Sequence, residues 1–226
     1  MSYLYHLFFF DPLYNFFLFL FKALPWADAG VIVILLTVLV RVILYPLSKK
    51  AVLTQARMSE IAPDLDKIKE KYKDKPEEQA RQTLALYREK KVNPFSGILV
   101  IIIQIPLILA LYQVFLRLPE GVPTTLFNFL DIGGKSVLIA LLAAVSTYFQ
   151  IQVSSKHQKA PKGNSFGDNL AKSMQTQMKY VFPVIAFFVS YQISAVIALY
   201  WFTTNLFSIA QEIFVRRHLQ PNSPKA

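Results

Sequence analysis

The sequence lacks cysteine altogether, and its acidic residues are few: 14 Asp and Glu accompany 24 Lys and Arg in 226 residues. Without cysteine the chain can form no disulfide, no thiolate metal site and no cysteine nucleophile. It also lacks the HExxH pattern of zinc proteases and the GxxxxGK[ST] loop of nucleotide hydrolases, and its three histidines are scattered through different regions. These absences disfavour an enzyme, and we expect no cofactor and no metal.

Hydrophobic residues are abundant instead. They make up 54% of the chain, charged residues only 17%, and the mean hydropathy is +0.38. A soluble domain of this length is rarely so apolar. The apolar residues are concentrated in four runs, at residues 29–47, 95–116, 136–153 and 180–215. The first three are close to the ~20 residues that a helix needs to cross a bilayer, so the sequence predicts an all-α integral membrane protein.

The fourth run is too long for one crossing. Its 36 residues would form a helix of about 54 Å, whereas the hydrocarbon core is about 30 Å thick. We therefore expect the chain to fold back at the polar residues Ser190, Tyr191 and Gln192, which are followed by Ser194. The five predicted spans are 29–47, 93–116, 135–153, 174–191 and 194–215.

Residues 1–28 contain a further apolar stretch, which is interrupted by Asp11, Asn15 and Lys22. The first 21 residues carry no Lys or Arg, unlike a secretory signal, which begins with a basic segment. We predict an amphipathic helix that lies in the membrane interface. A signal peptide or an additional span is the alternative that the sequence leaves open.

Basic residues indicate which loops stay in the cytoplasm. Three predicted loops are rich in Lys and Arg: 48–92 with twelve, 154–173 with four, and the short tail 216–226 with three. The loops on the opposite side, including the outer loop 117–134, are poor in them. These charges predict that the N-terminus lies outside and the C-terminus inside.

The loop at 48–92 is long enough to have structure of its own. Ile61, Leu65, Ile68 and Tyr72 recur at helical spacing. Pro76 is followed by two glutamates and predicts the start of a second helix, because proline suits the first turn and acidic residues suit the positive end of the helix dipole. We predict a cytoplasmic helical hairpin.

Arg41 stands inside the first predicted span, in LVRVILYPL (39–47). Eight residues separate it from Lys49, which places it about 12 Å inside the cytoplasmic end of the span. A charged side chain at this depth is costly in lipid and should face protein or water. The alternative is that the guanidinium snorkels to the interface. Thr37, one turn earlier on the same face, favours a polar interior.

Other polar side chains lie within the remaining spans, several at spacings that share a helix face. They are Gln104, Ser146, Gln150, Trp201, Asn205 and Ser208. Each could be an ordinary interhelical hydrogen-bond partner. Together with Arg41 and Thr37, and with no acidic residue near Arg41 in sequence, they predict a hydrated groove. Glu212, at the far end of the last span, leaves a structural ion pair with Arg41 as the alternative.

Five motifs, in order, resemble those of the YidC/Oxa/Alb family of membrane protein insertases. They are the arginine and proline of LVRVILYPL, NPFSGILVIIIQIPLILALY (93–112), TYFQ (147–150), MQTQMKYVFP (174–183) and ALYWFTTNLFSIAQ (198–211). The resemblance covers nearly the whole chain and implies five helices around a hydrophilic groove, open to the cytoplasm and to lipid but closed outside. It implies the compact form without a large outer domain, in the cell inner membrane, with Arg41 as the charge of the groove and Gln150 and Trp201 in its lining.

The resemblance also implies the partners. Nascent membrane proteins would be the clients, within the lipid bilayer, and the Sec translocon and the ribosome are candidate partners. The tail after Arg217 is short, which disfavours stable ribosome docking, because a long basic tail is the usual tether in the family. We expect no DNA partner. A small transporter or channel with a polar path is the alternative function, although the paired repeats or broken helices typical of transporters are not evident in the sequence.

Overall fold

A computed structural model describes residues 3–93, 96–119, 121–156 and 166–219. The elements, in order, are α1 (Tyr3–Tyr5), a π-helical turn (His6–Phe10), α2 (Asp11–Ala23), α3 (Ala29–Ile43), α4 (Tyr45–Lys71), α5 (Pro76–Glu89), α6 (Ser96–Leu116), β1 (Thr125–Leu126), β2 (Leu130–Asp131), α7 (Val137–Ser155), α8 (Phe166–Ile193) and α9 (Ala195–Leu219). The two strands form one short antiparallel pair. The prediction of an all-α protein is confirmed.

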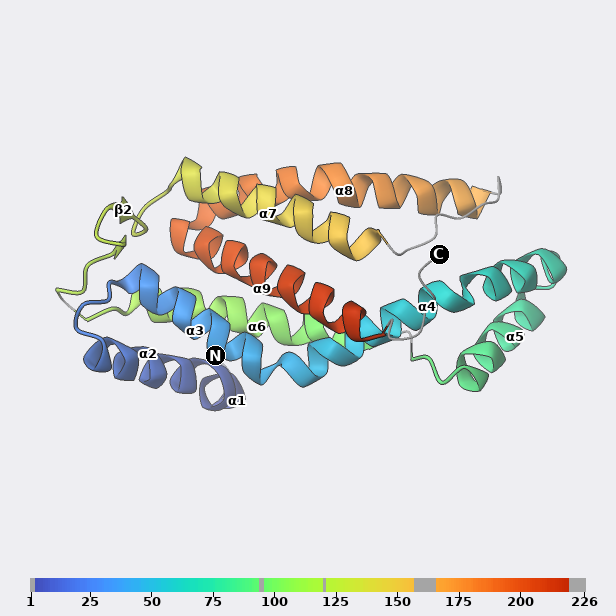
Figure 1. The fold of residues 1–226 in the computed structure, drawn as a ribbon, viewed down its shortest axis with the longest axis horizontal. Helices are drawn as coiled ribbons and strands as arrows, with labels where there is room; N and C mark the ends of the chain where they lie inside the picture. Colours follow the sequence, from blue (N-terminus) through green and yellow to red (C-terminus); the bar gives the residue numbers. More distant parts are fainter. Residues whose placement is uncertain (1–2, 94–95, 120, 157–165, 220–226) are drawn as a thin grey trace.

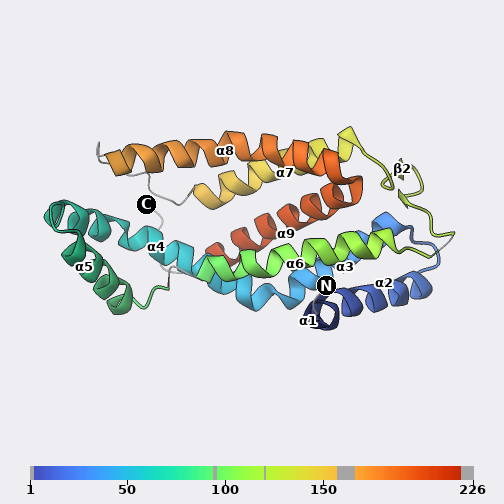
Figure 2. The ribbon, with the colours of Figure 1, turned by 180° about the vertical axis from the view of Figure 1, so that it is seen from behind.

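The long helices lie side by side in one elongated bundle. Figure 1 shows α7 and α8 along one side, α2, α3 and α6 along the other, and α9 between them. α9 contacts α7, α8, α3 and α6, so it lies at the centre of the bundle. The view from behind shows α6 beside α9 (Figure 2). Any polar side chain on α9 is therefore placed to meet residues from both halves of the bundle.

Helices long and apolar enough to cross a membrane are fewer than the five predicted spans. Within the described residues they are Tyr3–Ala23 and Val137–Ser155, and a third if α3 and α4 count as one bent span. α8 and α9 carry polar residues along their lengths, which lowers their mean hydropathy. The five-span topology therefore remains a prediction.

The first expected span, 29–47, is not one straight helix. α3 ends at Ile43, and α4 begins at Tyr45 at an angle of 63° to it. Pro46 lies in the first turn of α4 and cannot donate a backbone hydrogen bond to the preceding turn, which breaks the helix there. Arg41 therefore lies in the last turn of α3, where the negative end of the helix dipole favours a cation.

The long fourth apolar run does fold back, but the turn comes later than expected. Ser190 to Gln192 are helical residues of α8, and the break is at Ser194. The Ser190 hydroxyl donates to the backbone oxygen of Phe187, which satisfies it within the helix. The Ser194 hydroxyl accepts from the backbone N–H of Val196, so a serine cap begins α9.

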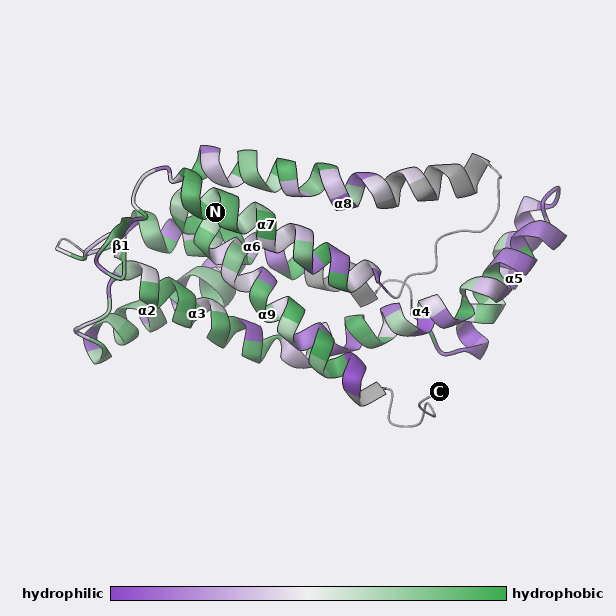
Figure 3. Ribbon diagram, turned by 45° about the horizontal axis from the view of Figure 1, so that its top comes forward, coloured by the Kyte–Doolittle hydropathy of each residue, from purple (hydrophilic) through white to green (hydrophobic). Residues whose placement is uncertain are grey.

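α4 and α5 project from the bundle as a pair of helices (Figure 1). α5 begins at Pro76, the residue at which the sequence predicts a helix start. Coloured by hydropathy, this pair is largely hydrophilic, whereas the helices of the bundle carry mostly hydrophobic residues (Figure 3). Each helix of the pair buries one apolar residue, Ile61 on α4 and Leu86 on α5.

The N-terminal helix shows features of both interpretations left open by the sequence. Its length and its position beside α3 fit a span. Its inner side buries Phe10, Leu13 and Phe17. Its exposed side carries Asp11, Asn15 and Lys22 on one stripe, and a carboxylate in the middle of a lipid-facing helix would be costly. The same helix also exposes the apolar side chains of Leu4, Phe8 and Phe19, so its interfacial placement stays a prediction.

Candidate functional site

Three helices meet around the guanidinium of Arg41. Its Nη2 donates a hydrogen bond to Oε1 of Gln104 on α6 at 3.2 Å. The amide nitrogen of Gln104 in turn donates to the hydroxyl of Tyr200 on α9. Arg41 is 8% exposed and Tyr200 3%. The cluster therefore places a positive charge inside the bundle, between α3, α6 and α9.

The charge of Arg41 is not balanced by a carboxylate. In the described part of the chain no Asp or Glu forms an ion pair with Arg41, and Glu212 pairs with Arg216 instead. The proposed alternative of a Glu212–Arg41 ion pair is therefore wrong. A guanidinium has five N–H donors, and the described residues engage one of them, at Gln104.

This arrangement suits the binding of an anionic group. Two opposite charges about 4 Å apart attract by about 1 kcal/mol in water but by about 4 kcal/mol at the effective dielectric of 20 that describes protein sites. Charge-assisted hydrogen bonds from arginine to a carboxylate are also short and directional. A carboxylate that reached Arg41 would find guanidinium donors that the described residues leave unengaged.

Two of the residues predicted to line the groove, Ser146 and Asn205, are hydrogen-bonded to each other. The amide of Asn205 on α9 donates to the hydroxyls of Ser146 at 3.0 Å and Thr147 at 2.8 Å on α7. All three side chains are buried, and both hydroxyls donate to the backbone oxygen of Ala143. For Ser146 and Asn205 the ordinary interhelical role fits better than a groove lining. Thr37 is likewise buried and donates to the backbone of its own helix, at Val33.

The remaining predicted groove residues are only partly buried. Gln150, Trp201 and Ser208 are of intermediate exposure, and in the described part of the chain no hydrogen bond engages their side chains. Trp201 packs against the hydrophobic core that α9 shares with α3 and α6. The structure thus brings Arg41 together with Gln104 but not with Gln150 or Ser208.

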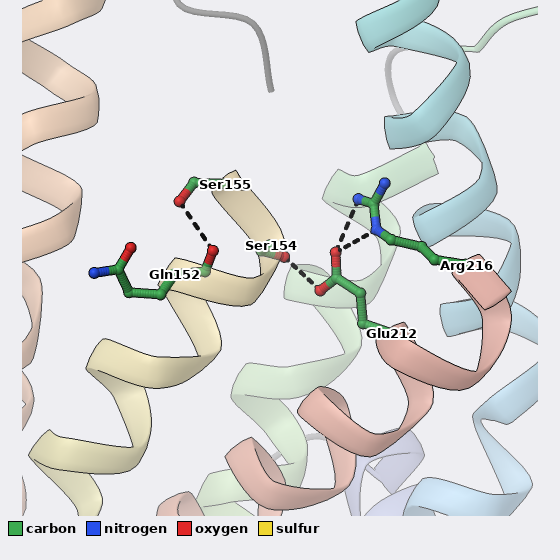
Figure 4. Close-up of polar contacts among 5 residues, drawn as sticks. All are labelled: Gln152, Ser154, Ser155, Glu212 and Arg216. Atoms are coloured by element: carbon green, nitrogen blue, oxygen red, sulfur yellow. Dashed lines mark hydrogen bonds and ion pairs between the residues drawn. The ribbon is translucent and has the colours of Figure 1, made fainter. Parts of the chain in front are cut away.

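A second polar cluster lies at the C-terminal ends of α7 and α9. Glu212 accepts from the Ser154 hydroxyl at 2.7 Å and pairs with the Arg216 guanidinium at 2.8 Å (Figure 4). The side chains of Glu212 and Arg216 are 4% and 12% exposed. Gln211, directly before Glu212, exchanges hydrogen bonds with Ser48 of α4. These contacts fasten α9 to both α7 and α4.

The end of the bundle opposite α5 is covered by the segment that contains β1 and β2 (Figure 1). Asp28, 2% exposed, accepts from the backbone N–H of Val31, from the Thr125 hydroxyl and from the backbone N–H of Asn128. The backbone oxygen of Gly134 accepts from the N–H of Ala195. One loop is therefore bonded to the first residues of both α3 and α9.

Several residues of these clusters were missed by the sequence reasoning. Tyr200 did not fit the spacing of the predicted groove residues, and only its neighbour Trp201 was predicted to line the groove. Asp28 did carry a signal, because an aspartate directly before an apolar run is a typical helix cap. Glu212 was considered only as a partner of Arg41, although its spacing to Arg216, four residues later on the same helix face, indicated the pair that the structure shows.

One short pattern could be mistaken for a hydrolase motif. Residues 163–167, GNSFG, have the GxSxG spacing of a serine nucleophile. That motif requires a strand directly before the serine. The strands among the described residues are 125–126 and 130–131, and they pair only with each other.

Comparison with known proteins assigns the family. The family model of the 60Kd inner membrane protein matches residues 19–222. A protein of Clostridium tetani named membrane protein insertase YidC is 30% identical over 200 residues, which cover 88% of this chain and 86% of that protein. One of the same name from Clostridium perfringens is 34% identical over 185 residues, covering 81% and 76%.

A relative of the same name from Francisella tularensis subsp. novicida is longer. It is 33% identical over 199 residues, which are 87% of this chain but 34% of that protein. The residues matched by the family model include Arg41 and α3 to α9. The chain belongs to the 60Kd inner membrane protein family, the YidC/Oxa family of inner membrane insertases.

Proposed function

We propose that this protein inserts other membrane proteins into the bilayer through a groove whose charge is Arg41. The observation that carries the proposal is a buried guanidinium with one engaged donor and no carboxylate partner in the described part of the chain. Short hydrophilic tails of clients would cross by way of this charge, and their hydrophobic helices would then pass into lipid. The clients are nascent membrane proteins.

The physical difficulty that such a groove removes is desolvation. A polar tail that crosses about 30 Å of hydrocarbon loses the water around its backbone and charges. A polar site part of the way across shortens the dry path, and Arg41 offers a partner to an acidic residue in the tail. No chemical energy is required for this step, because the burial of the apolar client helix in lipid favours the product.

The proposed topology has five spans, with the start of α3 outside and the C-terminus inside. The loop bonded to Asp28 and Ala195 closes the outer end, which supports entry from the cytoplasm. The hydrophilic α4–α5 pair lies at the opposite end (Figure 3). Release into lipid is supported by the exposed apolar residues Ile105 and Leu109 on α6 and Val184 and Phe188 on α8.

The test uses purified protein in liposomes and a single-span client with an acidic outer tail. We expect Arg41→Ala to lower insertion about tenfold, the effect of losing about 1.4 kcal/mol of attraction, and Arg41→Lys to retain most activity. Arg57→Ala, which removes an exposed arginine on α4, is the matched control. A client with a neutral tail should respond little to any of the three changes.

Two results would count against the proposal. Equal insertion by Arg41→Ala and the unchanged protein would exclude the attraction step. Steady ion conduction by the protein in a planar bilayer would instead favour the channel alternative, because an insertase with a closed outer end should not conduct.

A further inference from the structure

Two phenylalanines at the outer end of the molecule are exposed although they lie outside the helices. Phe127 is 69% exposed and Phe129 is 82% exposed. Both lie in the three-residue turn between β1 and β2, whose register pairs Leu126 with Leu130. Exposed apolar side chains are ordinary on the lipid-facing helices of a membrane protein. Two neighbouring exposed aromatic side chains on a loop instead indicate that the loop contacts something other than bulk water.

The turn adopts a backbone conformation that favours the display of both rings. Phe127 has φ of 55° and Asn128 has φ of 56°, the left-handed region that asparagine tolerates and phenylalanine rarely adopts. The turn is fastened by the backbone N–H of Asn128, which donates to Oδ2 of Asp28 at 2.7 Å. The buried carboxylate of Asp28 therefore holds the turn in a backbone conformation that phenylalanine rarely adopts.

The β1–β2 hairpin also packs closely against the first turn of α3. A Cβ added to Gly30, in the first turn of α3, would lie 2.7 Å from the backbone oxygen of Thr125, so β1 packs directly on the helix backbone there. Asp28 lies at the end of the same helix and bonds to Thr125 as well. The two rings are thus positioned rigidly with respect to the outer ends of the spans.

Other exposed apolar side chains lie at the outer ends of the helices. Trp26 precedes α3 and is 69% exposed, Leu116 ends α6 at 64%, and Val137 begins α7 at 57%. Tryptophan in particular is typical of the membrane interface. We propose that Phe127 and Phe129 insert into the outer leaflet, at the boundary between phospholipid headgroups and acyl chains, and so anchor the closing loop to the membrane.

A lipid surface fits this tip better than a protein partner does. An aromatic side chain can bury about 150–250 Å², so two of them fall well short of the ~800 Å² that each partner contributes to a standard protein interface. A membrane interface needs no complementary shape and accepts single aromatic rings. The same contact would hold the closing loop in place while helices of the groove move to admit a client.

The absence of cysteine allows a direct depth measurement. In Phe129→Cys an environment-sensitive fluorophore is attached to the single thiol, and the protein is placed in phosphatidylcholine–phosphatidylglycerol liposomes. Quenching by lipids brominated near the top of the acyl chain is compared with quenching by aqueous iodide. Lys73→Cys, in the exposed turn between α4 and α5, and Lys135→Cys, exposed on the outer side, are the matched controls.

We expect the label at position 129 to be quenched about threefold more by brominated lipid, and about threefold less by iodide, than the control labels. Phe127→Cys should behave like Phe129→Cys. Adding Asp28→Asn, which weakens the bond that fastens the turn, should reduce quenching by lipid. Iodide quenching equal to that at Lys73 would overturn the proposal. Protection from iodide without quenching by brominated lipid would overturn it too, because a protein contact would then cover the tip.

Discussion

The guanidinium of Arg41 on α3 and the side-chain amide of Gln104 on α6 are hydrogen-bonded at 3.2 Å, and the same amide donates to Tyr200 on α9. Gln104 therefore presents its oxygen to the cation and its nitrogen to the phenol. A neutral amide holds the charge in position without neutralising it. The positive charge of Arg41 stays unpaired in this cluster because residue 104 is glutamine and not glutamate.

Gln104→Glu should place a carboxylate of the protein itself against Arg41. The new carboxylate would lie within hydrogen-bond distance of Arg41 and would compete with acidic residues of the client. We expect insertion of an acidic-tailed client to fall about tenfold, corresponding to about 1.4 kcal/mol. Liposome insertion is the measurement, and Gln82→Glu on α5 is the control because it makes the same change outside the bundle. Unchanged insertion by Gln104→Glu would mean that clients do not use this cation.

Asn205 should contribute to stability rather than to client recognition. Asn205→Ala removes two hydrogen bonds to α7, each worth about 0.6–2 kcal/mol between membrane helices. We expect a lower midpoint of thermal unfolding in detergent, measured by circular dichroism, with the preference for acidic over neutral tails unchanged. Ser208→Ala, at a partly buried position on the same helix, should alter the midpoint little. Loss of tail preference in Asn205→Ala would instead place Asn205 in the groove.

We expect Glu212 and Arg216 to stabilise the fold only while both residues are present. Glu212→Ala leaves a guanidinium that is 12% exposed without its partner, and breaking a buried ion pair costs about 3 kcal/mol or more. The double change Glu212→Ala and Arg216→Ala should be less destabilising than the single change. Chemical denaturation in mixed micelles measures the free energy of unfolding of the two single variants and of the double variant. A double variant as unstable as the sum of the single ones would show that the two residues act independently.

The sequence predicted the helical class, the fold-back within residues 180–215 and the start of α5 at Pro76, because these depend on local patterns of apolar residues and on proline. It singled out Arg41 and Gln104 separately, since each is polar within an apolar run. Their contact could not be predicted, because it depends on how α3 and α6 pack. The hydrogen bond from the Asn205 amide to the Ser146 hydroxyl could not be predicted either, because it depends on how α7 and α9 pack.

The N-terminal helix offers the last test, because its two interpretations place the first residues on opposite sides of the membrane. Tyr3 is 77% exposed, and Tyr3→Cys provides a single thiol in a chain without cysteine. We expect a membrane-impermeant maleimide to label it from the outside, as it labels Lys135→Cys, because Asp11, Asn15 and Lys22 form a polar stripe that should meet water at the outer interface. Lys73→Cys should be labelled only from the inside. If Tyr3→Cys behaves like Lys73→Cys, the helix crosses the membrane, and Asp11 must then be shielded from lipid, for which His6, at 3.4 Å from its carboxylate, is the nearest partner.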